Sequence, residues 1–445
     1  MAEKVDPART AAFAALKLIR EGGYANLSLK EVLSQSRLST LDAGFVTELV
    51  YGVCRGMGTL DLVIEAASGR KLSTLQPGVV DIARLGTEQL LRMRVPSHAA
   101  VSSSVDLAKT RISPRVTGVV NAILRRVAEK TWDEWIVQIT SGMTKREALA
   151  IQACHPKWIV DVYADCLPEA ELLPALEANN HPPVPTLVAR PTLISREDLV
   201  DHSGGEPTPY SPWGVIRPGD PSEVEAVRDG RAGVQDEGSQ LVAGLLAQVE
   251  APQGQWLDLC SGPGGKTALL TGLAREFKEI LTAVELHPHR ADLVAEALRA
   301  YPDPGEVLVG DGRTPELGRI FSRVLVDAPC TGLGALRRRP EARWRKMAED
   351  LTELTTIQKE LLASACASAV PGAVVAYVTC SPHLRETAQV VQSVSPGIEI
   401  LDAPGFLPQV PNTQASSDPR FLQLWPHRHG TDAMFCALLR MPDSF

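Results

Sequence analysis

Two short apolar runs, each followed within a few residues by a cysteine, constrain the fold of this chain most strongly. The first, Val324–Val326, leads into Asp327–Cys330, and the second, Ala373–Val378, leads into Thr379–Cys380. Apolar runs of this length are typical of buried strands. Because ligands bind outside the carboxyl ends of the strands in an open α/β sheet, both thiols should face one crevice together with the carboxylate of Asp327. Two thiols and an acid in one cleft favour covalent chemistry.

A third segment supports this interpretation. Either cysteine alone would more often be a small buried hydrophobe, since free Cys is among the most buried residue types. However, Trp256–Cys260 is another apolar run, followed by the glycine-rich sequence SGPGGKT (261–267) and an apolar helical pattern. A strand, a glycine-rich turn and a helix form the nucleotide-cofactor corner of a doubly wound fold. The sequence therefore predicts a cofactor site next to the two cysteines.

The glycine-rich turn fits neither common phosphate-binding pattern. A P-loop needs a glycine where Cys260 stands, and the GxGxxG fingerprint is incomplete. A cofactor without a pyrophosphate fits better, with glycines that let the backbone approach it closely. Glu285, at the end of the next predicted strand, is placed for two ribose hydroxyls, and Asp311, after the third, for the adenine edge. Each acid alone is more often a helix cap, but their series favours the site.

The chain is too long, at 445 residues, for one hydrophobic core. In residues 1–145, apolar residues recur at helical spacing after Asp6-Pro7, which predicts an all-α domain. Residues 150–235 are rich in proline and contain short β-like pieces at 186–189 and 215–216, which indicates a small α+β linker domain. In residues 236–445, strands alternate with helices, which predicts a parallel, Rossmann-like α/β sheet covered on both faces.

The charge balance excludes a protein that coats nucleic acid without specificity. The net charge is −8, so any contact with RNA or DNA has to be local. In the segment RRRPEARWRK (337–346), six of ten residues are basic. A charge run is usually a solvated face, but this one follows Cys330 closely. We therefore expect it to contact RNA through Arg337, Arg338, Arg343 and Arg345.

The sequence shows no signal segment, membrane span or CxxC pair, and these absences underlie our expectations for location and metal content. Residues 1–10 have no apolar signal core, and the longest uncharged stretch, 361–384, is split by Pro371-Gly372. Eight cysteines without a CxxC pair favour reduced thiols rather than disulfides or zinc. We expect a cytoplasmic monomer with no metal and no membrane contact.

Five segments together resemble the motif series of a known family: DLCSGPGGKT, VELHPHR, GDGR, VDAPCTGLGALRRRPEARW and TCSPHLRE. The series is similar to that of the NOL1/NOP2/Sun family of S-adenosylmethionine-dependent RNA cytosine-5 methyltransferases. TELVYGV (47–53), VPSHAA (95–100) and VNAILRR (120–126) resemble the NusB-like domain of its bacterial RsmB (Sun, Fmu) branch. The resemblance implies a NusB-like RNA-binding domain, a class I methyltransferase domain and small-subunit ribosomal RNA as substrate.

Carried over to this sequence, the resemblance implies that Cys380 is the nucleophile and that Asp327 faces the cytosine. Cys330, directly after Asp327-Ala328-Pro329, is placed to assist release of the methylated base. S-adenosylmethionine would be held by Cys260, Ser261, Gly262, Pro263, Gly264, Gly265, Lys266, Glu285, Asp311 and Asp327. The chain departs from the family pattern in small ways. Ser261-Gly262 replaces two alanines, Glu285 stands where Asp is common, and in the tail after Cys380 only Glu386 matches clearly.

The implied chemistry explains these residue types. Cytosine C5 accepts a methyl group only after a thiolate adds at C6, and Asp327 can hydrogen-bond N3 as negative charge develops. Two alternatives remain. One is methylation of transfer RNA or DNA, although DNA enzymes of this kind use the Pro-Cys thiol and lack the second cysteine. The other is a non-catalytic RNA-binding scaffold, against which the presence of Cys380, Asp327 and the glycine-rich turn argues.

Overall fold

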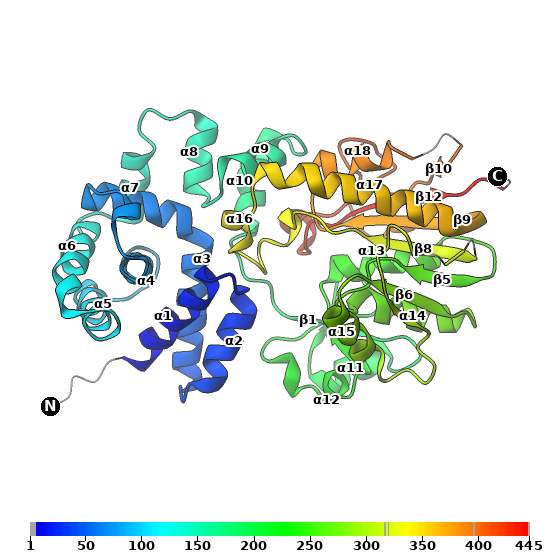
Figure 1. The fold of residues 1–445 in the computed structure, drawn as a ribbon, viewed down its shortest axis with the longest axis horizontal. Helices are drawn as coiled ribbons and strands as arrows, with labels where there is room; N and C mark the ends of the chain where they lie inside the picture. The colour runs from blue at the N-terminus through cyan, green and yellow to red at the C-terminus, as the bar shows by residue number, and fades with distance from the viewer. Residues whose placement is uncertain (1–5, 316, 319, 395–396, 444–445) are drawn as a thin grey trace. The chain divides into compact units, whose positions relative to one another are not determined.

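The protein forms two compact units, each drawn as part of the ribbon in Figure 1. The computed structural model describes residues 6–315, 317–318, 320–394 and 397–443. The first unit contains the described residues up to Asp161 together with an inserted segment, Arg338–Lys346, and the second contains Val162–Arg337 and the described residues from Met347 onward. The first unit thus extends past residue 145 and takes in a piece of sequence that lies between Cys330 and Cys380.

The first unit is all-helical around a long central helix, α3. Asp6 accepts a hydrogen bond from Arg9 N, and Pro7 opens the first helix, as the sequence predicts. Leu49, Val53 and Leu60 of α3 are fully buried. The elements are α1 (Pro7–Arg20), α2 (Ala25–Gln35), α3 (Thr40–Ser68), η1 (Leu72–Thr74), α4 (Pro77–Leu91), α5 (Ser97–Arg111), η2 (Pro114–Val116), α6 (Thr117–Val127), α7 (Trp132–Ile139), α8 (Lys145–Gln152) and α16 (Ala342–Arg345), with α9 (Lys157–Ala164) at the boundary.

The inserted segment is fixed in the first unit by hydrogen bonds to backbone groups. Trp344 Nε1 donates to the carbonyl of Cys54 at 2.8 Å. Arg343 Nη1 donates to the carbonyl of Cys154 at 3.0 Å, and Glu341 accepts from Ala25 N at 3.2 Å. The fully buried guanidinium of Arg343 therefore serves as an internal tie of the helical unit.

The second unit begins with a small antiparallel sheet in the order β2-β3-β1-β4. Its strands at 186–189 and 214–216 agree with the two β-like pieces predicted for the linker domain. Leu187, Leu199 and Val215 form part of its separate core. The elements are α10 (Glu169–Ala178), β1 (Thr186–Ala189), α11 (Arg196–Ser203), β2 (Glu206–Pro207), β3 (Gly214–Ile216), η3 (Pro221–Glu223), α12 (Glu225–Arg228) and β4 (Ala232–Val234).

A larger mixed sheet, in the order β10-β12-β9-β8-β5-β6-β7 with β11 beside β12, forms the rest of this unit. The strands from β9 to β7 are parallel, as predicted, but β12 runs antiparallel to β9. The prediction of a parallel sheet is therefore wrong at this edge, where β12 pairs antiparallel with both β9 and β10. The elements are α13 (Glu237–Gln248), β5 (Gln255–Asp258), α14 (Gly265–Glu276), β6 (Leu281–Glu285), α15 (Pro288–Leu298), β7 (Val307–Val309), β8 (Phe321–Asp327), η4 (Leu333–Ala335), η5 (Ala348–Asp350), α17 (Leu351–Ser368), β9 (Ala369–Thr379), η6 (Leu384–Glu386), α18 (Ala388–Val391), β10 (Glu399–Ile400), η7 (Pro404–Phe406), β11 (Leu422–Gln423), α19 (Pro426–His429) and β12 (Phe435–Arg440).

Helices cover both faces of this sheet, with α17 and α18 on one face and α13, α14 and α15 on the other (Figure 1). In β9, Val374 and Ala376 pack into the core with α13 and α14, whereas Val375 and Tyr377 pack into the core with α17. Strands buried on both faces read as continuous apolar runs, because alternate residues enter different cores. This explains why the uninterrupted apolar runs of the sequence mark the strands correctly.

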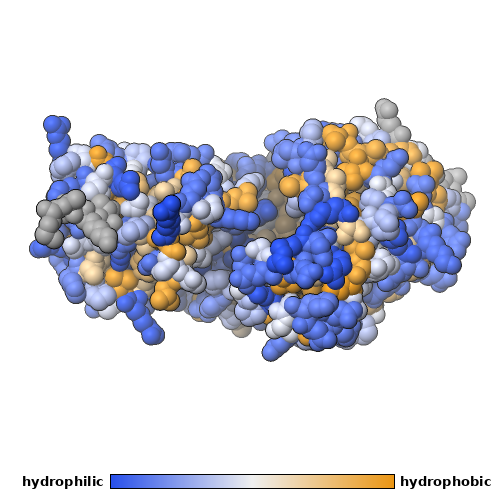
Figure 2. Space-filling model, turned by 90° about the horizontal axis from the view of Figure 1, so that it is seen from below, coloured by the Kyte–Doolittle hydropathy of each residue, from blue (hydrophilic) through white to orange (hydrophobic). Residues whose placement is uncertain are grey.

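The face shown in Figure 2 is mixed, with hydrophobic residues in small groups among hydrophilic ones. Across the described parts of the chain, every helix is too short or too polar to cross a membrane.

The packing of the inserted segment against α3 leads to a prediction about stability. A Cβ on Gly58 of α3 would lie 2.3 Å from the Trp344 ring. Gly58→Ala should therefore destabilise the protein by about 1–3 kcal/mol in urea unfolding, because the overpacking outweighs the gain in helix propensity.

The matched control is Gly44→Ala in the same helix, where a Cβ would meet nothing within 4 Å. It should stabilise the protein by up to about 1 kcal/mol. In a Trp344→Ala background, Gly58→Ala should lose most of its cost. Equal stabilities of Gly58→Ala and Gly44→Ala would contradict the packing of Trp344 on α3.

Candidate active site

The predicted site residues meet at the carboxyl ends of four neighbouring parallel strands of the second unit. Asp327 ends β8, Cys380 follows β9, the glycine-rich turn follows β5 and Glu285 ends β6. The strand order β9-β8-β5-β6 places these ends side by side. The cysteines, the acid and the turn thus share one edge of the sheet, where open α/β folds bind ligands.

The two cysteine sulfurs are in contact, with Cys330 Sγ 3.4 Å from Cys380 Sγ. Their loops are also joined through the backbone, since Gly334 N donates to the carbonyl of Cys380 at 2.8 Å. The hydrogen bond from Cys330 lowers the pKa of Cys380 against the opposing effect of burial, and the positive charge of Lys266 also lowers it. The same hydrogen bond raises the pKa of Cys330. Cys380 is therefore the thiol that ionises more readily, and the thiolate is the nucleophilic form.

Lys266 and Asp327 form an ion pair beside the thiols. Lys266 lies in the first turn of α14, and its Nζ reaches Asp327 Oδ2 at 2.7 Å. Burial disfavours the ammonium, but the attraction of Asp327 outweighs burial and raises the pKa of Lys266. Lys266 therefore stays charged, which places an ammonium next to the nucleophile.

The turn after β5 depends on two of its glycines. Gly262 N donates to Glu285 Oε2 at 3.0 Å, and a Cβ on Gly262 would lie 2.2 Å from that oxygen. Gly264 has φ +100°, and a Cβ there would lie 2.7 Å from Ala297 of α15. The sequence suggests close approach to the cofactor as the reason for these glycines. The structure adds that Gly264 lets the turn pack against α15.

The two predicted cofactor acids differ in their surroundings. Glu285 is buried and accepts hydrogen bonds from two backbone amides, Gly262 N and His287 N. Asp311, in the loop after β7, is partly exposed. It forms an ion pair with Arg313, whose Nη2 lies 2.6 Å from Asp311 Oδ2. This contact lowers the pKa of Asp311. Both carboxylates therefore lie at the same sheet edge as the turn, beyond the ends of β6 and β7.

The predicted RNA contacts of the basic segment require correction. Arg337 is buried in the second unit, where it pairs with Asp236 and, at 2.8 Å, with Asp432. Arg343 is fully buried in the first unit, and Arg345 donates to backbone carbonyls at the end of α1, including that of Gly23 at 2.7 Å. Arg343 presents no surface to a phosphate and Arg337 is 9% exposed with its guanidinium already paired, so we withdraw both as RNA contacts. Of the four, Arg338 and Arg345 are exposed.

Two further polar residues lie near the site, and the sequence assigned no role to either of them. Asp258, the last residue of β5, is buried and accepts from Thr267 Oγ1 at 2.8 Å. Burial raises the pKa of Asp258 to about 7. Glu386 is fully buried behind the two cysteine loops, 55 residues from one of its partners, Thr331. Asp258 lies in the predicted strand WLDLC, and Glu386 matches the family pattern after Cys380. The sequence does not indicate the hydrogen-bond partners of either residue.

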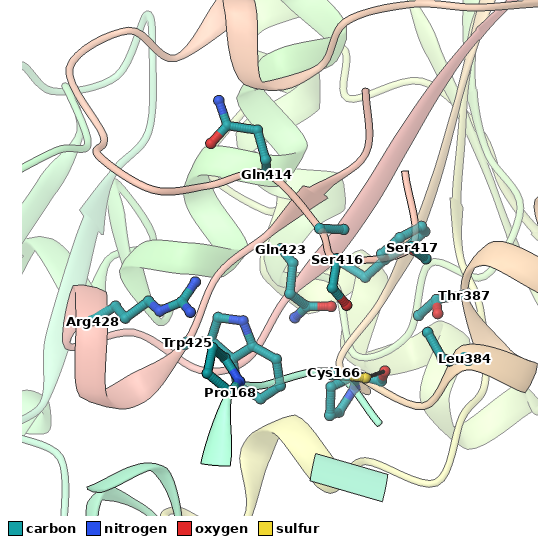
Figure 3. Close-up of a pocket in the computed structure, with 13 residues that line it drawn as sticks. Cys166, Pro168, Leu384, Thr387, Gln414, Ser416, Ser417, Gln423, Trp425 and Arg428 are labelled. Atoms are coloured by element: carbon teal, nitrogen blue, oxygen red, sulfur yellow. Dashed lines mark hydrogen bonds between the residues drawn. The ribbon is translucent and has the colours of Figure 1, made fainter. Parts of the chain in front are cut away.

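A pocket of about 210 Å³ lies beside the segment that follows Cys380. Figure 3 shows its wall residues, among them Cys166, Leu384, Trp425 and Arg428. None of the predicted catalytic or cofactor residues lines it. It is therefore distinct from the site of the two thiols. Within the described residues, no three His, Cys, Asp or Glu side chains are grouped as metal ligands.

Family models and full-length relatives match this chain. Residues 245–440 match the 16S rRNA methyltransferase RsmB/F family, and residues 6–129 match the NusB family. A Mycobacterium tuberculosis protein, named as an unproven methyltransferase, is 46% identical over 98% of this chain and 97% of its own length. The ribosomal RNA small subunit methyltransferase B of Erwinia tasmaniensis is 31% identical over 80% of this chain and 82% of its own.

Solved structures share the fold. The crystal structure of PH0851 covers 98% of this chain and 99% of its own, with a TM-score of 0.82 and 22% identity. The structure of NSun6 from Pyrococcus horikoshii covers 64% of this chain and 98% of its own, with a TM-score of 0.56 and 18% identity.

Asp258 generates a prediction about pH. Its pKa of about 7 in the folded protein lies above that of an unfolded aspartate, so the folded state binds the proton more tightly. Stability contributed by this proton is full below about pH 4 and is lost as the pH rises through about 7. Between pH 5 and pH 8, the free energy of unfolding should fall by about 3 kcal/mol more in wild type than in Asp258→Asn. Urea unfolding at each pH measures it.

Asp292→Asn, a change of an exposed aspartate in α15, serves as the control. Its free energy of unfolding should depend on pH with the same slope as that of wild type. If Asp258→Asn also kept that slope, the buried acid would not be protonated in this range.

Proposed function

Because this chain belongs to the RsmB/F family of 16S rRNA methyltransferases, we propose that it methylates C5 of a cytosine in small-subunit ribosomal RNA. S-adenosylmethionine is the methyl donor, and Cys380 forms a transient bond to C6 of the base. The observation that carries the proposal is the contact between Cys330 and Cys380, 3.4 Å apart, next to the Lys266–Asp327 ion pair.

The residues around the glycine-rich turn fit S-adenosylmethionine. The turn has glycines where a Cβ would meet Glu285 or α15, and two acids stand beyond the next strands. Leu286 and Val309, adjacent to these loops, are large apolar side chains that are about half exposed, at 52% and 56%. They give an adenine ring apolar surface, and Glu285 and Asp311 give its ribose and amino group acceptors. When bound, the cofactor supplies the methyl group from its sulfonium.

The first step uses the asymmetry between the two thiols. Cys380, with its lowered pKa, adds as a thiolate to C6, and the C5–C6 double bond electrons shift so that C5 becomes nucleophilic. Asp327 and Lys266 lie beside the nucleophile and can hydrogen-bond the polar edge of the base as charge develops there. The paired charges are fixed before the reaction, so they need little reorganisation.

Release of the methylated base breaks the bond between Cys380 and C6. After methyl transfer, a base takes the C5 proton, the C5–C6 double bond re-forms, and the electron pair of the S–C6 bond returns to Cys380. Cys330 lies in contact with that sulfur and can stabilise the departing thiolate by hydrogen bonding. We therefore assign Cys380 to bond formation and Cys330 to release.

Ribosomal RNA is favoured by two features of the comparisons. The relative from Erwinia tasmaniensis is named for the small ribosomal subunit, and residues 6–129 match the NusB family. A transfer RNA substrate or a non-catalytic scaffold would fit the catalytic fold alone. The monomeric state, a cytoplasmic location and RNA contacts by Arg338 and Arg345 stay predictions.

Substitution of the two cysteines tests the mechanism. Cys380→Ala should abolish methyl transfer and give no adduct, because the attacking sulfur is gone. Cys330→Ala should still add and methylate but release poorly. With labelled RNA and S-adenosylmethionine, it should give a slow-migrating band on a denaturing gel, and the double variant should lose that band.

Both variants should bind S-adenosylhomocysteine as wild type does in titration calorimetry, which controls for folding of the cofactor turn. An adduct formed only by Cys380→Ala would make Cys330 the nucleophile. Transfer of labelled methyl groups to transfer RNA but not to small-subunit ribosomal RNA would overturn the proposed substrate.

A further inference from the structure

Glu386 is a fully buried carboxylate that receives four hydrogen bonds. Thr331 N donates at 2.8 Å and Ser381 Oγ at 2.6 Å. Gln358 Nε2 donates at 3.1 Å, and the hydroxyl of Thr331 also donates to Oε2. All four donors are neutral groups. A buried carboxylate is costly unless its oxygens are hydrogen-bonded, so this cluster is stable only while these groups stay together.

Two of these partners connect Glu386 with the thiols. Thr331 directly follows Cys330, and Ser381 directly follows Cys380. The hydroxyls of Thr331 and Ser381 also lie 3.2 Å apart. One carboxylate therefore joins the residues next to both cysteines, although these loops are 50 residues apart in the sequence.

Glu386 is itself held on two sides. Its backbone carbonyl accepts from Tyr377 Oη of β9 at 2.8 Å. Gln358 of α17, which donates to the carboxylate, donates also to the carbonyl of Pro329 at 2.8 Å. The carboxylate is thus fixed to the sheet and to the covering helix, and both loops are fixed to the carboxylate.

We propose that Glu386 is a positioning residue that sets the distance between the Cys330 and Cys380 sulfurs. The inference rests on the proposed function for its consequence in catalysis, but the geometry it describes exists without RNA. A hydrogen bond weakens steeply with distance and angle, so a small shift of either loop would remove the support that Cys330 gives Cys380. Displacements near 1 Å can cost about 100-fold in rate.

Substitutions of different length separate positioning from charge. In Glu386→Gln, the amide oxygen can accept from Thr331 N while the amide nitrogen donates to the two hydroxyls, so the loops should stay in place. Glu386→Asp keeps the charge but is one methylene shorter, so it cannot reach both loops. Glu386→Ala removes all acceptors. Glu353→Ala, an exposed acid on α17, is the control for loss of charge.

The experiment measures thiol ionisation without RNA. Alkylation of Cys380 by iodoacetamide is followed by mass spectrometry from about pH 6 to about pH 10, with Cys330→Ala as the reference for a lost thiol contact. We expect Glu386→Asp and Glu386→Ala to move the Cys380 profile to higher pH, toward that of Cys330→Ala. Glu386→Gln and Glu353→Ala should keep the wild-type profile. Thermal unfolding identifies any variant that does not fold.

Catalysis provides the second readout. In methyl transfer to RNA, Glu386→Asp should lower kcat by about 100-fold with little change in KM for RNA or in cofactor affinity. A folded Glu386→Asp or Glu386→Ala with the wild-type alkylation profile would overturn the inference, as would a Cys330→Ala profile equal to wild type. A shifted profile in a protein whose wild type methylates no RNA would retain the positioning role and reject the proposed function.

Discussion

The parallel pairing of β8 with β9 is the interaction on which the site depends. Its register sets Asp327 opposite Val378, and Ala328 N continues the pairing by donating to the carbonyl of Val378 at 2.9 Å. Cys330 and Cys380 follow these partners by three and two residues, so both sulfurs emerge at the same level of the sheet. A register slip of one residue would turn every side chain of one strand to the opposite face and separate them.

The loop after Cys330 is anchored at both ends. On one side it follows β8, and on the other Arg337 is held in the second unit by Asp236, Asp432 and the carbonyl of Gly430. From Arg338 to Lys346 the chain belongs to the helical unit. The basic run between the two cysteines therefore contributes internal ties to both units, which gives a structural reason for its arginines.

Patterns in the sequence predicted the features that depend on local order. Apolar runs marked β5, β8 and β9 because strands buried on both faces are mostly apolar, and Asp6-Pro7 marked the start of α1. The antiparallel β12 and the burial of Arg343 depend on contacts between distant segments. A guanidinium that ties backbone carbonyls has the same one-dimensional appearance as one that binds phosphate. Likewise, nothing near Glu386 in the sequence indicates Thr331 or Gln358 as its partners.

We propose that this chain methylates cytosine in small-subunit ribosomal RNA through Cys380. Bisulfite sequencing of ribosomal and transfer RNA tests it most directly, in cells with the gene, without it, and with only the Cys380→Ala form. We expect one or more protected cytosines in small-subunit ribosomal RNA that lose protection without the gene and do not regain it with Cys380→Ala. Unchanged protection in ribosomal RNA, or recovery by Cys380→Ala, would contradict it.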